Sequence, residues 1–107
     1  MEITKAKSEG FRFSVRELGK EVGRAYLFLM YNDLHEEPFG LLEDVFVEEA
    51  YQSQGFGTKL VKQVIATAKE KKCYKLICTS RHSRPRVHAW YEKMGFKDHG
   101  KEFRMEP

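Results

Sequence analysis

Residues 41–65 read LLEDVFVEEAYQSQGFGTKLVKQVI, and this stretch decides the fold. An apolar run ends at Val47, and a short turn with glycines at positions 55 and 57 follows it. From Gly55 to about Lys72, apolar residues recur at the spacing of one helical stripe. The residues on that stripe are Phe56, Leu60, Val61, Val64, Ile65 and Ala68. The pattern predicts a strand, a glycine turn and a long amphipathic helix.

Three strands are predicted before the glycine turn. In Phe11–Glu17, apolar and polar residues alternate with the period of two that is typical of a half-buried strand. Glu21–Tyr31 is more continuously apolar and predicts a buried strand, separated from the first by a tight turn at Leu18–Lys20. Phe39–Val47 predicts the third. Because the connections are too short for a crossover, we expect an antiparallel meander.

After the long helix, Cys73–Thr79 predicts a fourth strand. It lies parallel to the third, because a helix joins the two in a βαβ unit. Val87–Met94 predicts a second, shorter helix that ends at Gly95, and Phe96–Met105 a final strand interrupted at Gly100. The predicted fold class is therefore α/β (α+β): a mixed, mostly antiparallel sheet with a central βαβ unit and two main helices.

The composition predicts one soluble domain covering residues 1–107. The chain has 107 residues, of which 41% are hydrophobic and 33% charged. A net charge of +3 is too small to indicate a nucleic-acid-binding protein. Cys73 and Cys78 fall on opposite faces of the predicted strand, so they neither bind a metal together nor form a disulfide. Free cysteines predict a cytoplasmic location, and no apolar run approaches the ~20 residues that span a bilayer.

The glycine turn is the strongest functional signal in the residues themselves. The start of a helix offers unpaired amides and a positive dipole end, and glycines let a phosphate approach them closely. A Walker A loop and a GxGxxG fingerprint both fail here, because the required glycines are absent. The pattern Q/R-x-x-G-x-G/A fits Gln52, Gly55 and Gly57. A glycine turn without any ligand remains the alternative.

Two segments together resemble the GNAT superfamily of acyl-CoA N-acyltransferases. Residues 41–65 resemble its central motif, and HAWYEKMGF at His88–Phe96 is similar to its second motif, A-x-x-[FY]-Y-x-[KR]-x-G-F. The resemblance implies acetyl-CoA as cosubstrate, with its pyrophosphate on the backbone amides of residues 54–58. It also implies that Val45 and Val47 pair with the pantetheine arm and that an amide near Val45 polarises the thioester carbonyl. The predicted cofactor-binding residues are Val45, Phe46, Val47, Gln52, Ser53, Gln54, Gly55, Phe56, Gly57, Thr58 and Arg84.

Acetyl transfer needs a neutral amine and a protonated leaving group. Glu43 and Asp44 are the candidate bases, and alternation along a strand predicts that only one faces the site. Glu43 is favoured, because members of the family that the sequence resembles place an acidic residue there. Tyr91, the tyrosine of the second motif, is the predicted acid to the departing thiolate; the alternative is a core tyrosine. Arg84 stands where many such proteins have asparagine, and it either contacts a coenzyme A phosphate or is simply exposed.

Two other functions stay open at this point: a CoA-binding module without activity, and a nucleic-acid-binding domain that uses Arg81, Arg84 and Arg86. No metal site is predicted, because His82 and His88 have no third ligand. Members of the resembled family begin with a strand and two helices, whereas here Met1–Gly10 precede the first strand. We therefore expect an acceptor site that is open or completed by another subunit, and a homodimer that covers the exposed sheet edge. The acceptor amine is not specified by the sequence.

Overall fold

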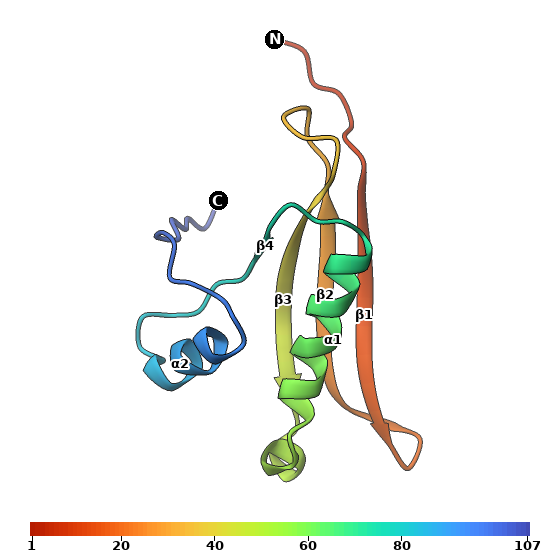
Figure 1. The fold of residues 1–107 in the computed structure, drawn as a ribbon, viewed down its shortest axis with the longest axis vertical. Helices are drawn as coiled ribbons and strands as arrows, with labels where there is room; N and C mark the ends of the chain where they lie inside the picture. The colour runs from red at the N-terminus through yellow and green to blue at the C-terminus, as the bar shows by residue number, and fades with distance from the viewer.

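The computed structural model describes all residues, 1–107. The chain forms four strands, one 3₁₀ helix and two α-helices (Figure 1). The elements are β1 (Ser8–Glu17), β2 (Lys20–Met30), β3 (Phe39–Val47), η1 (Glu49–Gln54), α1 (Phe56–Glu70), β4 (Leu76–Ile77) and α2 (Pro85–Lys93).

The strands form one mixed sheet in the order β1-β2-β3-β4. The first three are antiparallel neighbours, which confirms the predicted meander. β3 and β4 are parallel and pair through Gly40 with Leu76 and Leu41 with Ile77, as the predicted βαβ unit requires. The predicted fold class is therefore confirmed.

Helix α1 covers one face of the sheet and buries the core against it (Figure 1). The helix contributes the apolar stripe that the sequence predicts, and strands β2 and β3 contribute alternate residues. The fully enclosed cluster consists of Ala25, Leu27, Leu29, Leu42, Leu60, Val61, Val64 and Ala68. This one-sided core places the start of α1 beside the end of β3, where the glycine turn lies.

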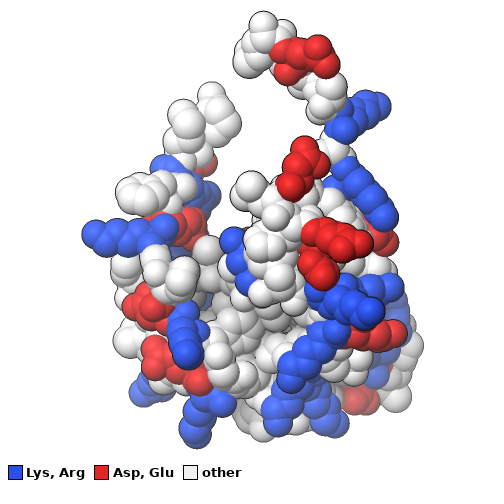
Figure 2. Space-filling model, turned by 45° about the horizontal axis from the view of Figure 1, so that its top comes forward, with Lys and Arg blue, Asp and Glu red and all other residues white.

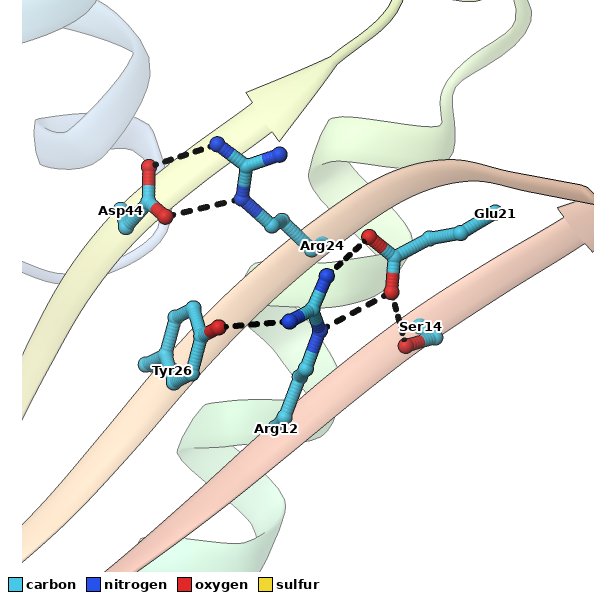
Figure 3. A network of polar contacts seen from close by, with 6 residues as sticks. All are labelled: Arg12, Ser14, Glu21, Arg24, Tyr26 and Asp44. Carbon is cyan, nitrogen blue, oxygen red and sulfur yellow. Dashed lines mark hydrogen bonds and ion pairs between the residues drawn. The ribbon is translucent and has the colours of Figure 1, made fainter.

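The sheet face opposite α1 carries a network of polar side chains (Figure 3). The Arg12 guanidinium donates to both carboxylate oxygens of Glu21 and to the Tyr26 hydroxyl, the last at 2.8 Å. Ser14 also donates to Glu21. The hydrogen bonds from Arg12 and then from Ser14 lower the pKa of Glu21 to about 2. Glu21 is therefore ionised and fully engaged at neutral pH.

One predicted strand is shorter than expected, and another is absent. Only Leu76–Ile77 of the segment 73–79 is a strand, so neither Cys73 nor Cys78 lies in one. The reason is that the segment pairs with β3 only at Gly40 and Leu41 and then separates from it. The predicted strand Phe96–Met105 is absent: these residues pair with none of the four strands, and a strand needs a paired neighbour to satisfy its backbone groups. Helix α2 begins two residues earlier than predicted, since Pro85 at its first turn has a backbone angle suited to a helix start.

Neither α1 nor α2 is long and apolar enough to cross a lipid bilayer.

Candidate functional site

A cavity opens where β3 and the segment after β4 separate. Strand pairing between them ends at Leu41, so beyond Leu42 the edge of β3 that faces α2 has no neighbouring strand. The cavity encloses about 390 Å³, a volume suited to a small ligand. It is lined by Leu42, Glu43, Asp44, Val45, Thr79, Ser80, Arg81, Arg84, Val87, Trp90, Tyr91, Glu102 and Arg104.

A β-bulge in β3 shapes one wall of this cavity. Arg24 pairs with Phe46 and Tyr26 with Glu43, so two residues, Asp44 and Val45, lie opposite the single residue between them on β2. Asp44 has a φ of 48°, in the left-handed region. The prediction that only one of the two carboxylates faces the site is therefore wrong, because the extra residue breaks the alternation and both line the cavity.

The two carboxylates differ in their partners. Asp44 receives two hydrogen bonds from the guanidinium of Arg24, at 2.8 and 3.3 Å. The Glu43 side chain makes no hydrogen bond or ion pair within the protein, and it is exposed to the cavity. Glu43 is thus the carboxylate that is free to act on a ligand.

Tyr91 faces the same cavity from α2. Its ring packs between Trp90, at 4.9 Å between centroids, and Phe96, at 5.4 Å. Burial, and then the nearby Cys78 and Glu43, raise the pKa of Tyr91 to about 12. Its hydroxyl forms no hydrogen bond with the protein, unlike the core tyrosine of the alternative interpretation. At neutral pH it is a protonated donor without a protein acceptor.

Cys78 lies in the same electrostatic neighbourhood. Burial, and then the charge of Glu43, raise the pKa of its thiol to about 11. Since the thiolate is the nucleophilic form of cysteine, a thiol with so high a pKa is unreactive at neutral pH.

The glycine turn lies between η1 and α1. Gly55 has a φ of 78° and ends η1, and α1 begins with the next residue. No side chain caps α1, and the amide of Lys59 is the first to bond back, to the Gly55 carbonyl at 3.1 Å. The amides that precede Lys59 therefore lie outside the hydrogen-bond ladder of the helix, as an anion site requires.

The Gln52 side chain ties this turn to the end of β3. Its amide nitrogen donates to the carbonyl oxygen of Val47 at 3.0 Å. The side chain of Gln52 is therefore used to hold the turn in place, and it supports the predicted binding residues from within the protein.

Trp90 connects the cavity to the glycine turn. Its indole nitrogen donates to the Thr58 hydroxyl at 3.0 Å, and its ring lies against Gly57, where an added Cβ would be 3.6 Å away. Because Trp90 and Tyr91 are consecutive in α2, the contact that joins α2 to α1 also sets the position of the Tyr91 ring.

The structure brings five of the fourteen predicted site residues to one cavity. Glu43, Asp44, Val45, Arg84 and Tyr91 line it, and Gly57 and Thr58 of the glycine turn contact Trp90 on its wall.

Phe46 does not line the cavity. Its ring is exposed and lies beneath the guanidinium of Arg24, 4.7 Å from the ring centroid. Ser53 and Gln54 are exposed in η1.

Sequence reasoning missed part of the cavity wall. Two hydrogen bonds hold the backbone of Arg81 in place. Its carbonyl oxygen accepts from the Arg84 amide at 3.1 Å and from Nε2 of His88 at 2.8 Å. The bond to a carbonyl means that Nε2 of His88 carries the proton. Glu102 and Arg104 belong to a segment without secondary structure, and no motif marks them. The missed residues are Leu42, Thr79, Ser80, Arg81, Val87, Trp90, Glu102 and Arg104.

Charge in and around the cavity is mixed. Three carboxylate and three guanidinium side chains line it, so it suits a ligand with both positive and negative groups. On the face drawn in Figure 2, basic and acidic side chains are interspersed, without the continuous basic stripe of a nucleic-acid interface. The six charged residues of the lining are Glu43, Asp44, Glu102, Arg81, Arg84 and Arg104.

Comparison with known proteins connects this site to one family. The model of the Acetyltransferase (GNAT) family matches residues 2–96. A solved structure from Agrobacterium tumefaciens strain C58 superposes with a TM-score of 0.85 and 31% identity, over 92% of this chain and 69% of that one.

Two curated proteins match part of the sequence. The probable glucosamine 6-phosphate N-acetyltransferase 2 of Oryza sativa subsp. japonica is 40% identical over 63 residues, which are 57% of this chain and 35% of that protein. The glucosamine 6-phosphate N-acetyltransferase of Trypanosoma brucei brucei is 35% identical over 68 residues, 63% of this chain and 44% of that protein. The matched region thus spans less than half of either relative.

The bond between Trp90 and Thr58 predicts non-additive effects on stability. Trp90→Phe and Thr58→Val each remove one partner of a half-buried hydrogen bond, and each is expected to lower the free energy of unfolding by about 0.5–1.5 kcal/mol. In the double variant the bond is lost only once, so the combined loss is smaller than the sum. Urea unfolding of the four proteins measures this coupling, and strictly additive losses would show that the bond contributes nothing.

Proposed function

Because the chain belongs to the Acetyltransferase (GNAT) family, we propose that it transfers an acetyl group from acetyl-CoA to a primary amine. The observation that carries this proposal is the arrangement of Glu43 and Tyr91, two groups without protein partners on one cavity beside an uncapped helix start. Acetyl-CoA supplies the activated carbonyl that the amine attacks.

The binding residues follow from the open backbone. The amides of residues 54–58 hold the pyrophosphate, since they lie outside the ladder of α1 and no side chain caps that helix. The free edge of β3 at Val45 and Val47 pairs with the pantetheine arm as an added strand would. Arg84, on the cavity wall, is placed to meet a phosphate or a pantetheine amide.

Glu43 is the proposed base. An alkylammonium ion has a pKa near ~10.4 and must lose a proton before it attacks. A carboxylate that is exposed to the cavity and not held by an arginine can accept that proton, directly or through a water molecule. Asp44 is paired with Arg24 and is less suited to the role.

Tyr91 is the proposed donor to the departing thiolate. Because its pKa is about 12, its hydroxyl stays protonated wherever the enzyme is expected to work. A thiol is more acidic than this phenol, with a pKa near ~8.5. Tyr91 therefore stabilises the thiolate chiefly by hydrogen bonding as the bond to the acetyl group breaks.

We propose an amino sugar phosphate as the acceptor. The two curated relatives carry the name of an enzyme that acts on glucosamine 6-phosphate. The cavity supports such a substrate, because Arg81 and Arg104 offer charge to a phosphate while Glu43 lies ready for an amine. The two unpaired thiols, Cys73 and Cys78, favour a reducing compartment such as the cytoplasm.

We also propose a homodimer in which two copies of β1 pair at the open sheet edge. β1 is the outermost strand of the sheet, so one of its edges has no neighbouring strand within the chain. An antiparallel pair centred on Phe13 sets Phe11 of one copy opposite Val15 of the other, so half-buried apolar side chains meet.

The proposed roles predict distinct losses in two variants. Tyr91→Phe lowers kcat about ten- to a hundredfold, because the thiolate loses its donor, and Glu43→Gln lowers it by about a hundredfold or more. Coenzyme A affinity is unchanged in both. A thiol-release assay measures kcat, and calorimetry measures the affinity for coenzyme A. Unchanged turnover in either variant removes that residue from the mechanism.

The pKa of Tyr91 also predicts a pH dependence. In the wild type, Tyr91 causes no decline of kcat near pH 10, since its pKa of about 12 lies above that pH.

The acceptor proposal predicts a preference for phosphorylated amino sugars. With acetyl-CoA, kcat/KM for glucosamine 6-phosphate is expected to exceed that for glucosamine, and Arg81→Gln reduces the difference about tenfold or more. Glucosamine is the matched control, because it has the same amine without the phosphate. Equal rates for both sugars would contradict the phosphate site, and rates higher with polyamines or peptides would point to another acceptor class.

The dimer proposal predicts a mass near twice that of the chain in light scattering at tens of micromolar protein. Val15→Lys places a charged side chain opposite Phe11 of the other copy, where an apolar contact is proposed, and shifts the mass toward that of the monomer. Lys20→Glu, at the hairpin outside the paired edge, serves as a control. A wild type that is entirely monomeric at this concentration overturns the proposal.

A further inference from the structure

We propose that the ion pair between Arg24 and Asp44 holds the bulge of β3 in its cavity-forming shape, and that Asp44 is a positioning residue and not a second base. The inference rests on the proposed acetyl transfer and adds two residues to it. Arg24 and Asp44 come from neighbouring strands and face one another on the same side of the sheet (Figure 3).

The contacts fix Asp44 from the side of β2. Nε and Nη2 of Arg24 each donate to a different carboxylate oxygen of Asp44, which restrains both the position and the plane of the carboxylate. The same guanidinium lies 4.7 Å from the centroid of the Phe46 ring. Arg24 therefore touches β3 on both sides of Val45, at the first residue of the bulge and just after it.

Asp44 needs such a restraint because of its backbone. A φ of 48° is in the left-handed region, where residues other than glycine are uncommon, and the comparable position of many bulges is a glycine. Asparagine and aspartate enter this region more readily than other side chains. Glycine would adopt this conformation readily but would not be restrained in it. An aspartate that is paired across the sheet adopts the same conformation and is held there by its partner.

The neighbouring charged side chains, Arg12 and Glu21, pair with each other, which leaves Arg24 to pair with Asp44. Glu21 is the other carboxylate on this face near Arg24, and it is already engaged by Arg12 and Ser14 (Figure 3). Arg12 is in turn held by Glu21 and Tyr26. Each arginine thus has its own carboxylate, and Asp44 is the one that belongs to the bulge.

The bulge has a direct consequence for the site. Because of the extra residue, the adjacent residues Glu43 and Asp44 both line the cavity, and Val45 follows them there. In a regular strand, alternation would turn successive residues to opposite faces. Loss of the bulge would therefore misplace the proposed base and the amide proposed to polarise the thioester carbonyl.

Substitutions at Asp44 separate a positioning role from a catalytic one. Asp44→Asn tolerates a left-handed backbone and keeps an oxygen that accepts from Arg24, so kcat is expected to fall least, by about threefold. Asp44→Gly tolerates the backbone but lacks the ion pair, so kcat falls further. Asp44→Ala tolerates it poorly and lacks the ion pair, so kcat falls about tenfold or more. If Asp44 were a base, all three variants would fall together and by as much as Glu43→Gln, and the proposal would be overturned.

A second measurement does not depend on activity. Amide hydrogen exchange of residues 43–46 in the ligand-free protein is expected to speed up about tenfold in Asp44→Ala and Arg24→Gln, and to remain near wild type in Asp44→Asn. Arg12→Gln is the matched control, because it removes a neighbouring arginine that does not touch the bulge. Exchange that is equal in the wild type and Arg24→Gln contradicts the proposal. A wild type without acetyl transfer would refute the proposed function but leave this exchange result readable.

Discussion

The separation of β3 from β4 is the constraint on which the rest of this molecule depends. Two strands that pair over only two positions leave one edge of β3 without hydrogen-bond partners, in the middle of the fold. Buried backbone groups are almost always paired, so such an edge is stable only if solvent or a ligand reaches it. The cavity along Glu43 and Val45 gives that access. The bulge lies on this open edge of β3, and the expected final strand does not form beside it.

Three devices keep this open site in shape. Gln52 ties the glycine turn to the end of β3, Trp90 joins α2 to the start of α1, and Arg24 pairs with Asp44 across the sheet. Each is a side-chain interaction that joins two different elements of the fold. The reactive groups, Glu43 and Tyr91, make no such bonds, so they remain available to a ligand. The division between residues that hold the site and residues that act in it is therefore visible in the hydrogen bonds.

Much of this could be predicted from the sequence, because periodicity carries the information. The alternation in 11–17 and the stripe from Phe56 to Ala68 correctly predict the meander and the long helix, and two motifs predict Tyr91 and Glu43 on one cavity. What failed depends on tertiary geometry. Residues 73–79 and 96–105 have strand-like composition, but strand formation requires a neighbouring edge, which composition does not reveal. The bulge at Asp44 overturned the expected alternation, and no motif marks Glu102 and Arg104.

Coenzyme A is proposed to bind along the open edge of β3 and on the amides that begin α1. A titration with coenzyme A, followed by amide chemical shifts, tests this binding. The expected shifts are saturable and are largest at Val45, at Gly55–Thr58 and at the indole of Trp90, with little change along β1. Shifts that do not saturate, or that cluster on β1 and the outer face of β2, would contradict it.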